Sequence, residues 1–182
     1  MLLAAGRGSR FSGPRHKLNS LLEGRPLVEH ALEAALLAEL DATYLVVGAE
    51  PISAPPGVII VRNPRWAEGL ASSLTAAIAA ARQDGHEAIV VALADQPRVT
   101  ADAWRTVSDR SDVAAVFASY DGRRGHPVRL HRSVWDLVPA SGDEGARRSL
   151  ERAGVAIADV ECSGSPFDVD TLADLAELDN PA

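Results

Sequence analysis

Short apolar runs that alternate with helical segments are the feature that most limits how this chain folds. Residues 44–47, 58–61 and 88–94 are almost continuously apolar, as the strands of a buried parallel sheet are. Between them, residues 27–37 place apolar side chains at helical spacing, and residues 69–81 are a small-residue helix. Strands that alternate with helices favour a parallel sheet covered on both faces. The sequence therefore predicts an α/β protein with three layers, α/β/α, and a mainly parallel sheet.

The second half of the chain adds further elements and one reversal of direction. Asp121 and Gly122 are a hairpin turn signal, so the strand after them is expected to return antiparallel. Thr171 and Asp174 have the spacing of a capping box that starts the last helix, and Asp143 has the position of an N-cap. The other expected elements are helices over 100–110, 133–137 and 146–153 and strands over 113–119, 126–130 and 155–160.

A glycine-rich segment directly follows the first apolar residues. Gly6, Gly8 and Gly13 tolerate backbone angles that let main-chain N–H groups point at an anion. Lys17, the only lysine of the chain, closes this segment, and it lies in a local cluster of positive charge although the net charge is -7. Lysine presents a compact point charge where arginine presents a planar fork. The segment therefore predicts a polyphosphate site; a solvated surface charge is the alternative interpretation of Lys17.

Two common phosphate-binding loops do not fit this segment. Walker A requires lysine after its second glycine, and here Pro14 follows Gly13. The dinucleotide fingerprint requires a third glycine where Phe11 stands. A different kind of nucleotide loop is therefore expected.

Three aspartates are candidate metal ligands. Asp95 follows the strand expected over 88–94, and ligands of open α/β sheets bind beyond the carboxyl ends of strands. There it either holds Mg²⁺ through hard oxygen atoms or merely turns the chain before Pro97. Asp168 and Asp170 share one face of an extended segment, where two carboxylates repel unless a cation or donor lies between them. The alternative is a pair of solvated acids.

Two serines stand near the start of the small-residue helix. Ser72 and Ser73 follow a polar loop over 62–69. Small residues let a helix pack closely on a sheet, and a helix N-terminus also attracts anions. Both interpretations of these serines are open from the residues alone.

Several short motifs together resemble one family. The pattern Leu-Ala-Ala-Gly-x-Gly-x-Arg-Phe over 3–11, followed by Lys17, resembles the signature of the nucleotidyltransferases that include the molybdenum-cofactor cytidylyltransferases, the MobA-like NTP transferases. Three residues separate Gly13 from Lys17, where the family usually has one or two. The other similar motifs are Asn-Pro-x-Trp-Ala-Glu-Gly from residue 63, Leu-x-Asp-x-Pro from residue 93, Gly-His-Pro-Val from residue 125, the segment 142–147, and Asp-x-Asp-Thr from residue 168.

The resemblance implies a Rossmann-like nucleotidyltransferase domain over residues 1–182 and a role for each matching residue. It implies transfer of CMP from CTP to a phosphate of the molybdenum–molybdopterin cofactor, with release of pyrophosphate and with Mg²⁺ as the cofactor. The Ala4-Ala5 pair before Gly6 is similar to the cytidylyl branch. The implied catalytic residues are Lys17, Arg10 and Asp95, and the implied metal ligands are Asp95, Asp168 and Asp170. The implied nucleotide-binding residues are Leu3, Ala4, Ala5, Gly6, Arg7, Gly8, Lys17 and Ser72; His126 and Arg147 belong to the acceptor side.

Composition limits partners and compartment. The isoelectric point of 5.2 argues against a general binder of nucleic acid or of membrane surfaces, and no signal peptide or membrane span is recognisable. Cys162 is alone, which fits a reducing cytoplasm and a role as a small apolar filler late in a strand. The first strand is short, which fits either a truncated chain or a late-assigned start. The resemblance implies as partners CTP, an anionic phosphate acceptor, and a molybdoenzyme or cofactor-inserting protein.

Three other functions are compatible with the same sequence. The acceptor phosphate could belong to a sugar or to another cofactor. A nicotinamide-dependent oxidoreductase could use Glu50, after the second strand, to hold a ribose, although the incomplete glycine fingerprint counts against it. A carrier could bind molybdopterin without turning it over.

Overall fold

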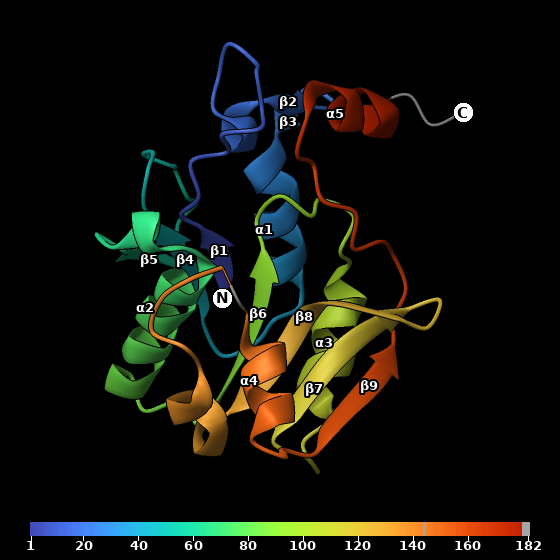
Figure 1. Cartoon of the computed structure of the whole chain (residues 1–182). Helices are drawn as coiled ribbons and strands as arrows, with labels where there is room; N and C mark the ends of the chain where they lie inside the picture. The colour runs from blue at the N-terminus through green and yellow to red at the C-terminus, as the bar shows by residue number, and fades with distance from the viewer. Residues whose placement is uncertain (144, 180–182) are drawn as a thin grey trace.

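The computed structural model describes residues 1–143 and 145–179, and its centre is one seven-stranded sheet (Figure 1). The strand order is β5-β4-β1-β6-β8-β7-β9, and β8 alone runs antiparallel to its neighbours β6 and β7. A separate two-stranded ribbon pairs β2 with β3. The strands are β1 (Leu2–Ala4), β2 (Leu21–Leu22), β3 (Arg25–Pro26), β4 (Thr43–Val47), β5 (Val58–Arg62), β6 (Ala88–Leu93), β7 (Ala115–Tyr120), β8 (Arg123–His131) and β9 (Ile157–Glu161).

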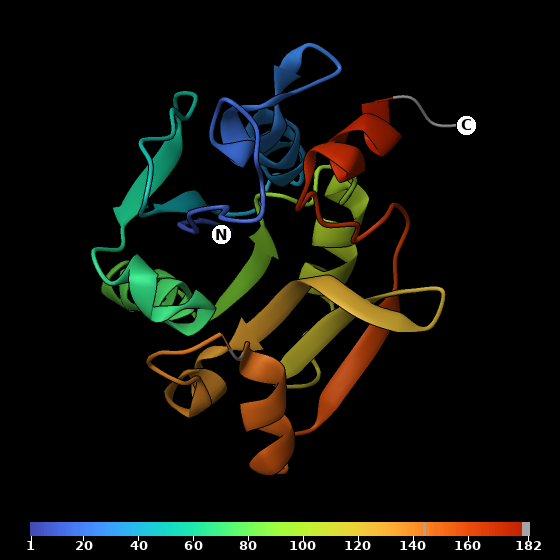
Figure 2. The ribbon, with the colours of Figure 1, turned by 45° about the horizontal axis from the view of Figure 1, so that its top comes forward.

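Helices cover both faces of the sheet and bury two apolar layers. α1 and α3 pack on one face, where Leu2, Leu45 and Trp104 are buried. α2 and α4 pack on the other face, where Leu3, Val46 and Leu150 are buried. α5 lies beside the β2–β3 ribbon (Figure 2). The helices are η1 (Lys17–Asn19), α1 (Leu27–Leu37), η2 (Trp66–Glu68), α2 (Leu70–Gln83), α3 (Ala101–Asp109), η3 (Arg132–Leu137), α4 (Ala146–Arg152) and α5 (Leu172–Asp179), the η elements being 3₁₀ helices.

The predicted fold class is confirmed, because the sheet is mainly parallel and lies between two helical layers. The hairpin is confirmed too: Asp121 and Gly122 adopt φ angles of 51° and 75°, and β8 returns antiparallel to β7. The capping box is confirmed, since the Thr171 N–H donates to Asp174 Oδ2 (2.7 Å) and the Asp174 N–H donates to Thr171 Oγ1 (3.2 Å). In the parts of the chain described, no helix is both long and apolar enough to span a bilayer.

The N-cap prediction for Asp143 is wrong. α4 begins at Ala146 with Gly145 as its N-cap, and no side chain caps it. The loop instead continues the hydrogen bonding of α2: Gly142 O accepts from the Ala71 N–H (2.9 Å), and the Gly142 N–H donates to Glu68 O (2.6 Å). These bonds draw the loop over 140–143 across the start of α2, so the Asp143 carboxylate is available for another contact.

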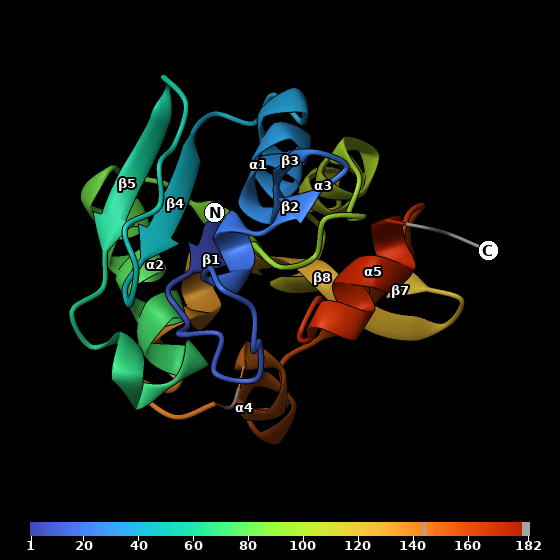
Figure 3. The same cartoon turned by 90° about the horizontal axis from the view of Figure 1, so that it is seen from above.

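One edge of the sheet gathers the segments that the sequence singles out. The parallel strands β1 and β6 end side by side there, so the loops after them meet (Figure 3). The segment over 163–171 returns across the same edge: Val99 forms an isolated antiparallel bridge with Gly164, and the Val169 N–H donates to Asp95 O (3.0 Å). That return brings Asp170 next to residues more than 70 positions earlier in the chain.

Candidate functional site

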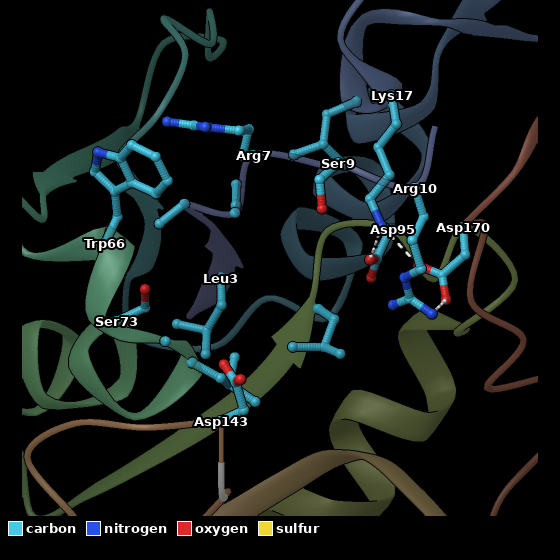
Figure 4. Close-up of a pocket in the computed structure, with 18 of the residues that line it drawn as sticks. Leu3, Arg7, Ser9, Arg10, Lys17, Trp66, Ser73, Asp95, Asp143 and Asp170 are labelled. Carbon is cyan, nitrogen blue, oxygen red and sulfur yellow. Dashed lines mark hydrogen bonds and ion pairs between the residues drawn. The ribbon is translucent and has the colours of Figure 1, made fainter. Parts of the chain in front are cut away.

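A cleft of about 480 Å³ opens at this edge of the sheet, and we call it the glycine-loop cleft. Its floor is the end of β1 and the loop after it, residues 3–10. Figure 4 shows that it has two unlike ends: Lys17, Asp95 and Asp170 lie at one end, and Trp66 lies at the other. A ligand with one charged end and one ring-bearing end matches this polarity.

The charged end is a compact network of two cations and two carboxylates. Lys17 Nζ donates to Asp95 Oδ2 (2.6 Å) and to Asp170 Oδ1 (3.2 Å). Arg10 Nη1 lies 2.8 Å from Asp170 Oδ2. The Lys17 side chain is 12% exposed, whereas that of Arg10 is 75% exposed. Burial lowers the pKa of Lys17, but the charges and hydrogen bonds of Asp95 and Asp170 outweigh burial and raise it, so Lys17 is a cation.

The glycine loop places Lys17 in this network. Gly8 adopts a φ of 64°, and a Cβ atom there would lie 3.3 Å from Lys17 Cγ. The loop is closed from the other side by His16, whose Nε2 lies 3.0 Å from Gly6 O and whose Nδ1 accepts from the Leu18 N–H. In this loop, Gly8 provides both a positive φ angle and room for the Lys17 side chain.

Asp95 offers an oxygen atom suited to a metal ion. Its Oδ1 is buried and has no hydrogen-bond partner, although a buried carboxylate oxygen normally has one. Asp170 adds a second carboxylate to the same end of the cleft. Mg²⁺ takes one or two carboxylates and completes its shell with water and phosphate oxygens. The pair fits such an ion, although no group of three or more His, Cys, Asp or Glu side chains that could hold a metal occurs among the residues described.

Asp168 does not line the cleft with this pair. Its Oδ1 accepts from Gln96 Nε2 (2.8 Å). Desolvation, and next the charge of Asp95, raise the pKa of the Asp168 carboxyl. The alternation that puts Asp168 and Asp170 on one face of the segment therefore does not bring both into the cleft.

The opposite end of the cleft is built around Trp66. The guanidinium of Arg7 lies 5.1 Å from the centre of the indole ring, a cation–π contact. Trp66 fits there because residue 48 is glycine: a Cβ on Gly48 would lie 2.5 Å from Trp66 Cβ and 2.8 Å from Ala5 O. Trp66 belongs to the motif that begins at Asn63, and it was not predicted as a site residue. The signal that could have found it is a tryptophan, one of three in the chain, in a segment that is otherwise polar.

The two serines of α2 have different surroundings. Both are buried and both accept from Asn63 Nδ2, at 2.9 Å for Ser72 and 3.1 Å for Ser73. Ser72 Oγ also donates to the main-chain oxygens of Arg65 and Gly69, and it does not line the cleft, whereas Ser73 does. The serine that faces the cleft is therefore Ser73, and Ser72 ties the polar loop to α2.

The predicted acceptor residues line a second hollow, which we call the apolar cavity. It has a volume of about 280 Å³ and shares Leu3 and Leu70 with the glycine-loop cleft. Leu74, Phe117 and six further apolar residues line it, together with the exposed Arg124 and Arg147 and the partly buried His126. Burial lowers the pKa of His126 to about 4, so this imidazole is neutral at pH 7. Positive charge at this cavity comes from Arg147 and from Arg124, which also pairs with Glu151 and Asp159, and not from His126.

The structure thus brings most of the predicted site together. Residues 3–8, Arg10, Lys17, Asp95 and Asp170 all line one cleft. Ser72 and Asp168 lie outside that cleft, and His126 and Arg147 line the neighbouring cavity. Glu50, the candidate ribose ligand of an oxidoreductase, lines neither hollow.

Comparison with known proteins supplies independent findings. A family model described as the MobA-like NTP transferase domain matches residues 1–157. The chain is 27% identical to the purine catabolism protein PucB of Bacillus subtilis, in an alignment 192 positions long that covers 94% of this chain and 90% of PucB. It is 32% identical to the bifunctional protein GlmU of Caulobacter vibrioides over 109 residues, which cover 56% of this chain and only 23% of GlmU.

Solved structures agree with this match. Rv0371c from Mycobacterium tuberculosis superposes with a TM-score of 0.83 at 27% identity, covering 98% of this chain and 95% of that one. A structure of Rv0371c in complex with manganese gives a TM-score of 0.78 at 25% identity, covering 97% of this chain and 95% of that one. The likeness therefore extends over nearly the whole fold.

Proposed function

Because the chain belongs to the family of MobA-like NTP transferase domains, we propose that it transfers CMP from CTP to a phosphate of the molybdenum–molybdopterin cofactor and releases pyrophosphate. The nucleotidyltransferase class follows from the family. CTP, the acceptor and Mg²⁺ are the finer parts of the proposal. They rest on the Ala4-Ala5 variant of the loop and on the chemistry of the two hollows.

The observation that carries the proposal is the meeting of the lone lysine with two carboxylates at the glycine loop. Asp95 and Asp170 lie 78 and 153 positions after Lys17 in the chain, yet both accept a hydrogen bond from its ammonium group. Nucleotidyl transfer requires positioning of the phosphates and neutralisation of their charge more than a covalent catalyst. In this proposal the main-chain N–H groups of 6–8, with Arg10 and Lys17, hold the triphosphate.

Asp95 and Asp170 are the residues that would hold a divalent metal ion. The unpartnered Oδ1 of Asp95 supports this assignment, as does the manganese complex of the related Rv0371c. A bound Mg²⁺ supplies further charge neutralisation for the phosphates. Asp168 remains a candidate third ligand through its Oδ2, because its Oδ1 accepts from Gln96.

Trp66 and Ser73 define where the base would lie. With the phosphates at Lys17, the nucleoside reaches toward the Trp66 end of the cleft. The Ser73 hydroxyl accepts from Asn63 and has a proton left to donate to a base. Asp143, which also lines the cleft, can accept from an amino group. One donor and one acceptor match cytosine, whose ring offers both an acceptor and an exocyclic amino group.

The apolar cavity supports a ring-bearing acceptor over a sugar. A sugar phosphate needs many hydrogen-bonding partners for its hydroxyl groups, whereas this cavity is walled mainly by leucine, valine and phenylalanine side chains. Arg147 at the cavity supplies positive charge for a phosphate. The neutral His126 offers at most a hydrogen bond.

The test of the proposal is pyrophosphate release with CTP, GTP and ATP against molybdopterin-type and sugar-phosphate acceptors. We expect turnover with CTP and the molybdenum cofactor. Lys17→Ala should lower turnover by about 10²–10³-fold, the usual loss when one preorganised charge donor is removed, while the far-UV circular dichroism is unchanged. Arg148→Ala, on the exposed face of α4, is the matched control and should keep most of the activity.

Two results would contradict the proposal. Turnover of the Lys17→Ala variant at the wild-type rate would remove Lys17 from the mechanism. Binding of the cofactor without pyrophosphate release, unchanged in Asp95→Ala, would identify a carrier instead of an enzyme.

A further inference from the structure

We infer that Lys17 is a built-in competitor of the divalent metal ion, so that the free chain binds the metal weakly and a nucleotide must draw Lys17 away before the carboxylates can hold it. This inference rests on the proposed function for the identity of the site. It adds a coupling between the two ligands that neither the family nor the relatives specify.

The carboxylate oxygens are almost fully engaged by the chain's own cations. Lys17 Nζ occupies Oδ2 of Asp95 and Oδ1 of Asp170, and Arg10 occupies Oδ2 of Asp170. Of the four oxygens, only Asp95 Oδ1 has no partner. A metal ion that binds both carboxylates therefore competes with Lys17 and Arg10 for their oxygen atoms.

The charges of the network already cancel. Two carboxylates face one ammonium and one guanidinium, so the group is neutral before any ligand arrives. A divalent ion added to this network is repelled by two cations a few ångströms away, and only the two carboxylates attract it. Because the Lys17 side chain is only 12% exposed, little solvent screens that repulsion.

A triphosphate changes this balance because it gives the two cations another partner. The glycine loop that would hold the phosphates lies beside the stem of Lys17, since a Cβ atom on Gly8 would lie 3.3 Å from Lys17 Cγ. The flexible four-carbon stem of lysine lets its ammonium move from the carboxylates to the phosphates. Once it has moved, Asp95 and Asp170 are free for the metal. Nucleotide and metal therefore bind with positive coupling, which by linkage must be reciprocal.

The first test measures metal affinity without any nucleotide. Mn²⁺ binding is followed by electron paramagnetic resonance for the wild type, Lys17→Met and the control Arg148→Met. We expect Lys17→Met to bind Mn²⁺ about tenfold more tightly than the wild type, within the usual range of coupling between sites. The control should match the wild type. Asp95→Asn should bind less tightly than either, which shows that the ion is at this site.

The second test uses the wild type and the uniqueness of Lys17. Labelling lysine at Cε gives one resonance from the chain, because it contains one lysine. We expect Mg²⁺ alone to leave that resonance in place and a non-reactive CTP analogue with Mg²⁺ to shift it. This arm needs no variant, so it decides the question even if Lys17→Met does not fold.

The inference is overturned if Lys17→Met binds Mn²⁺ no more tightly than the wild type, or if Mg²⁺ alone shifts the Lys17 resonance as far as the nucleotide complex does. Failure of the proposed function looks different. In that case no nucleoside triphosphate shifts the resonance, while the metal affinities of the first test still rank the variants.

Discussion

At the scale of single residues, His126 shows how burial keeps a histidine side chain uncharged. The resemblance implies that His126 belongs to the acceptor side, with a partly buried structural histidine as the alternative, and burial lowers its pKa to about 4. Positive charge at the apolar cavity comes from the exposed Arg124 and Arg147. A sequence motif places a side chain, but its protonation state depends on the neighbours that folding brings.

This burial predicts a stability change with pH. Between pH 6.5 and about 4, the unfolded chain takes up a proton at His126 that the folded chain does not. The free energy of unfolding should therefore fall as pH is lowered through that window, by up to about 1.4 kcal/mol per pH unit from this residue. Urea unfolding at pH 7 and pH 4.5 should show a larger loss for the wild type than for His126→Gln. Equal losses in the two proteins would contradict the pKa.

Gly48 carries a second prediction at this scale. A methyl group there would meet Trp66 and the main-chain oxygen of Ala5 at less than 3 Å. Gly48→Ala should lower the free energy of unfolding by about 1–3 kcal/mol, as overpacking does, and should displace Trp66. Urea unfolding followed by circular dichroism measures the first effect. Gly145→Ala is the control, because a Cβ there meets no atom within 4 Å; similar losses in both variants would contradict the packing argument.

At the scale of elements, the return of 163–171 depends on the N-terminus of α5. Asp174 Oδ2 accepts from the N–H groups of Asp170 (2.9 Å) and Thr171 (2.7 Å), so the cap of the helix also fixes the backbone of a proposed metal ligand. Asp174 has a lowered pKa, first because of its hydrogen bond from the Asp170 backbone, and is therefore ionised at neutral pH. The hydrogen bonds that cap α5 therefore also hold the backbone of Asp170 at the glycine-loop cleft.

Removing this cap should affect both stability and binding. Thr171→Ala should lower the free energy of unfolding by about 0.5–2 kcal/mol, the usual loss of an N-cap hydroxyl. Thr171→Ser keeps the hydroxyl and should behave like the wild type. Urea unfolding of the three proteins checks the effect on stability, and Mn²⁺ binding in the presence of a nucleotide checks the effect on Asp170. Unchanged stability of Thr171→Ala would mean that the cap contributes little.

The sequence predicted helices and strands better than it predicted contacts between residues that are distant along the chain. Continuous apolar runs located β4, β5 and β6, and the Asp121-Gly122 turn located the antiparallel strand, because both signals are local. The N-cap at Asp143 failed because the loop bonds to α2, a contact that is distant in sequence. For the same reason alternation did not reveal that Asp168 would bond to Gln96 and lie outside the cleft, or that Ser73 would face the cleft in place of Ser72.

At the scale of the whole molecule, ligand binding should be visible as thermal stabilisation. A ligand that binds only the folded state at about 100 times its Kd adds roughly 2.7 kcal/mol. For a chain of 182 residues this corresponds to a rise in Tm of roughly 5–10 °C. We expect CTP with Mg²⁺ to give the largest rise among CTP, GTP, ATP and NADPH, as measured by differential scanning fluorimetry. A rise with NADPH alone would favour the oxidoreductase.

The path of residues 163–171 also bears on how the protein matures during translation. Asp95 is synthesised 78 residues after Lys17, and Asp170 is synthesised 153 residues after Lys17. A nascent chain thus exposes its lysine and its first aspartate before the second carboxylate can complete the network. The network can close only after all seven strands of the sheet have been synthesised.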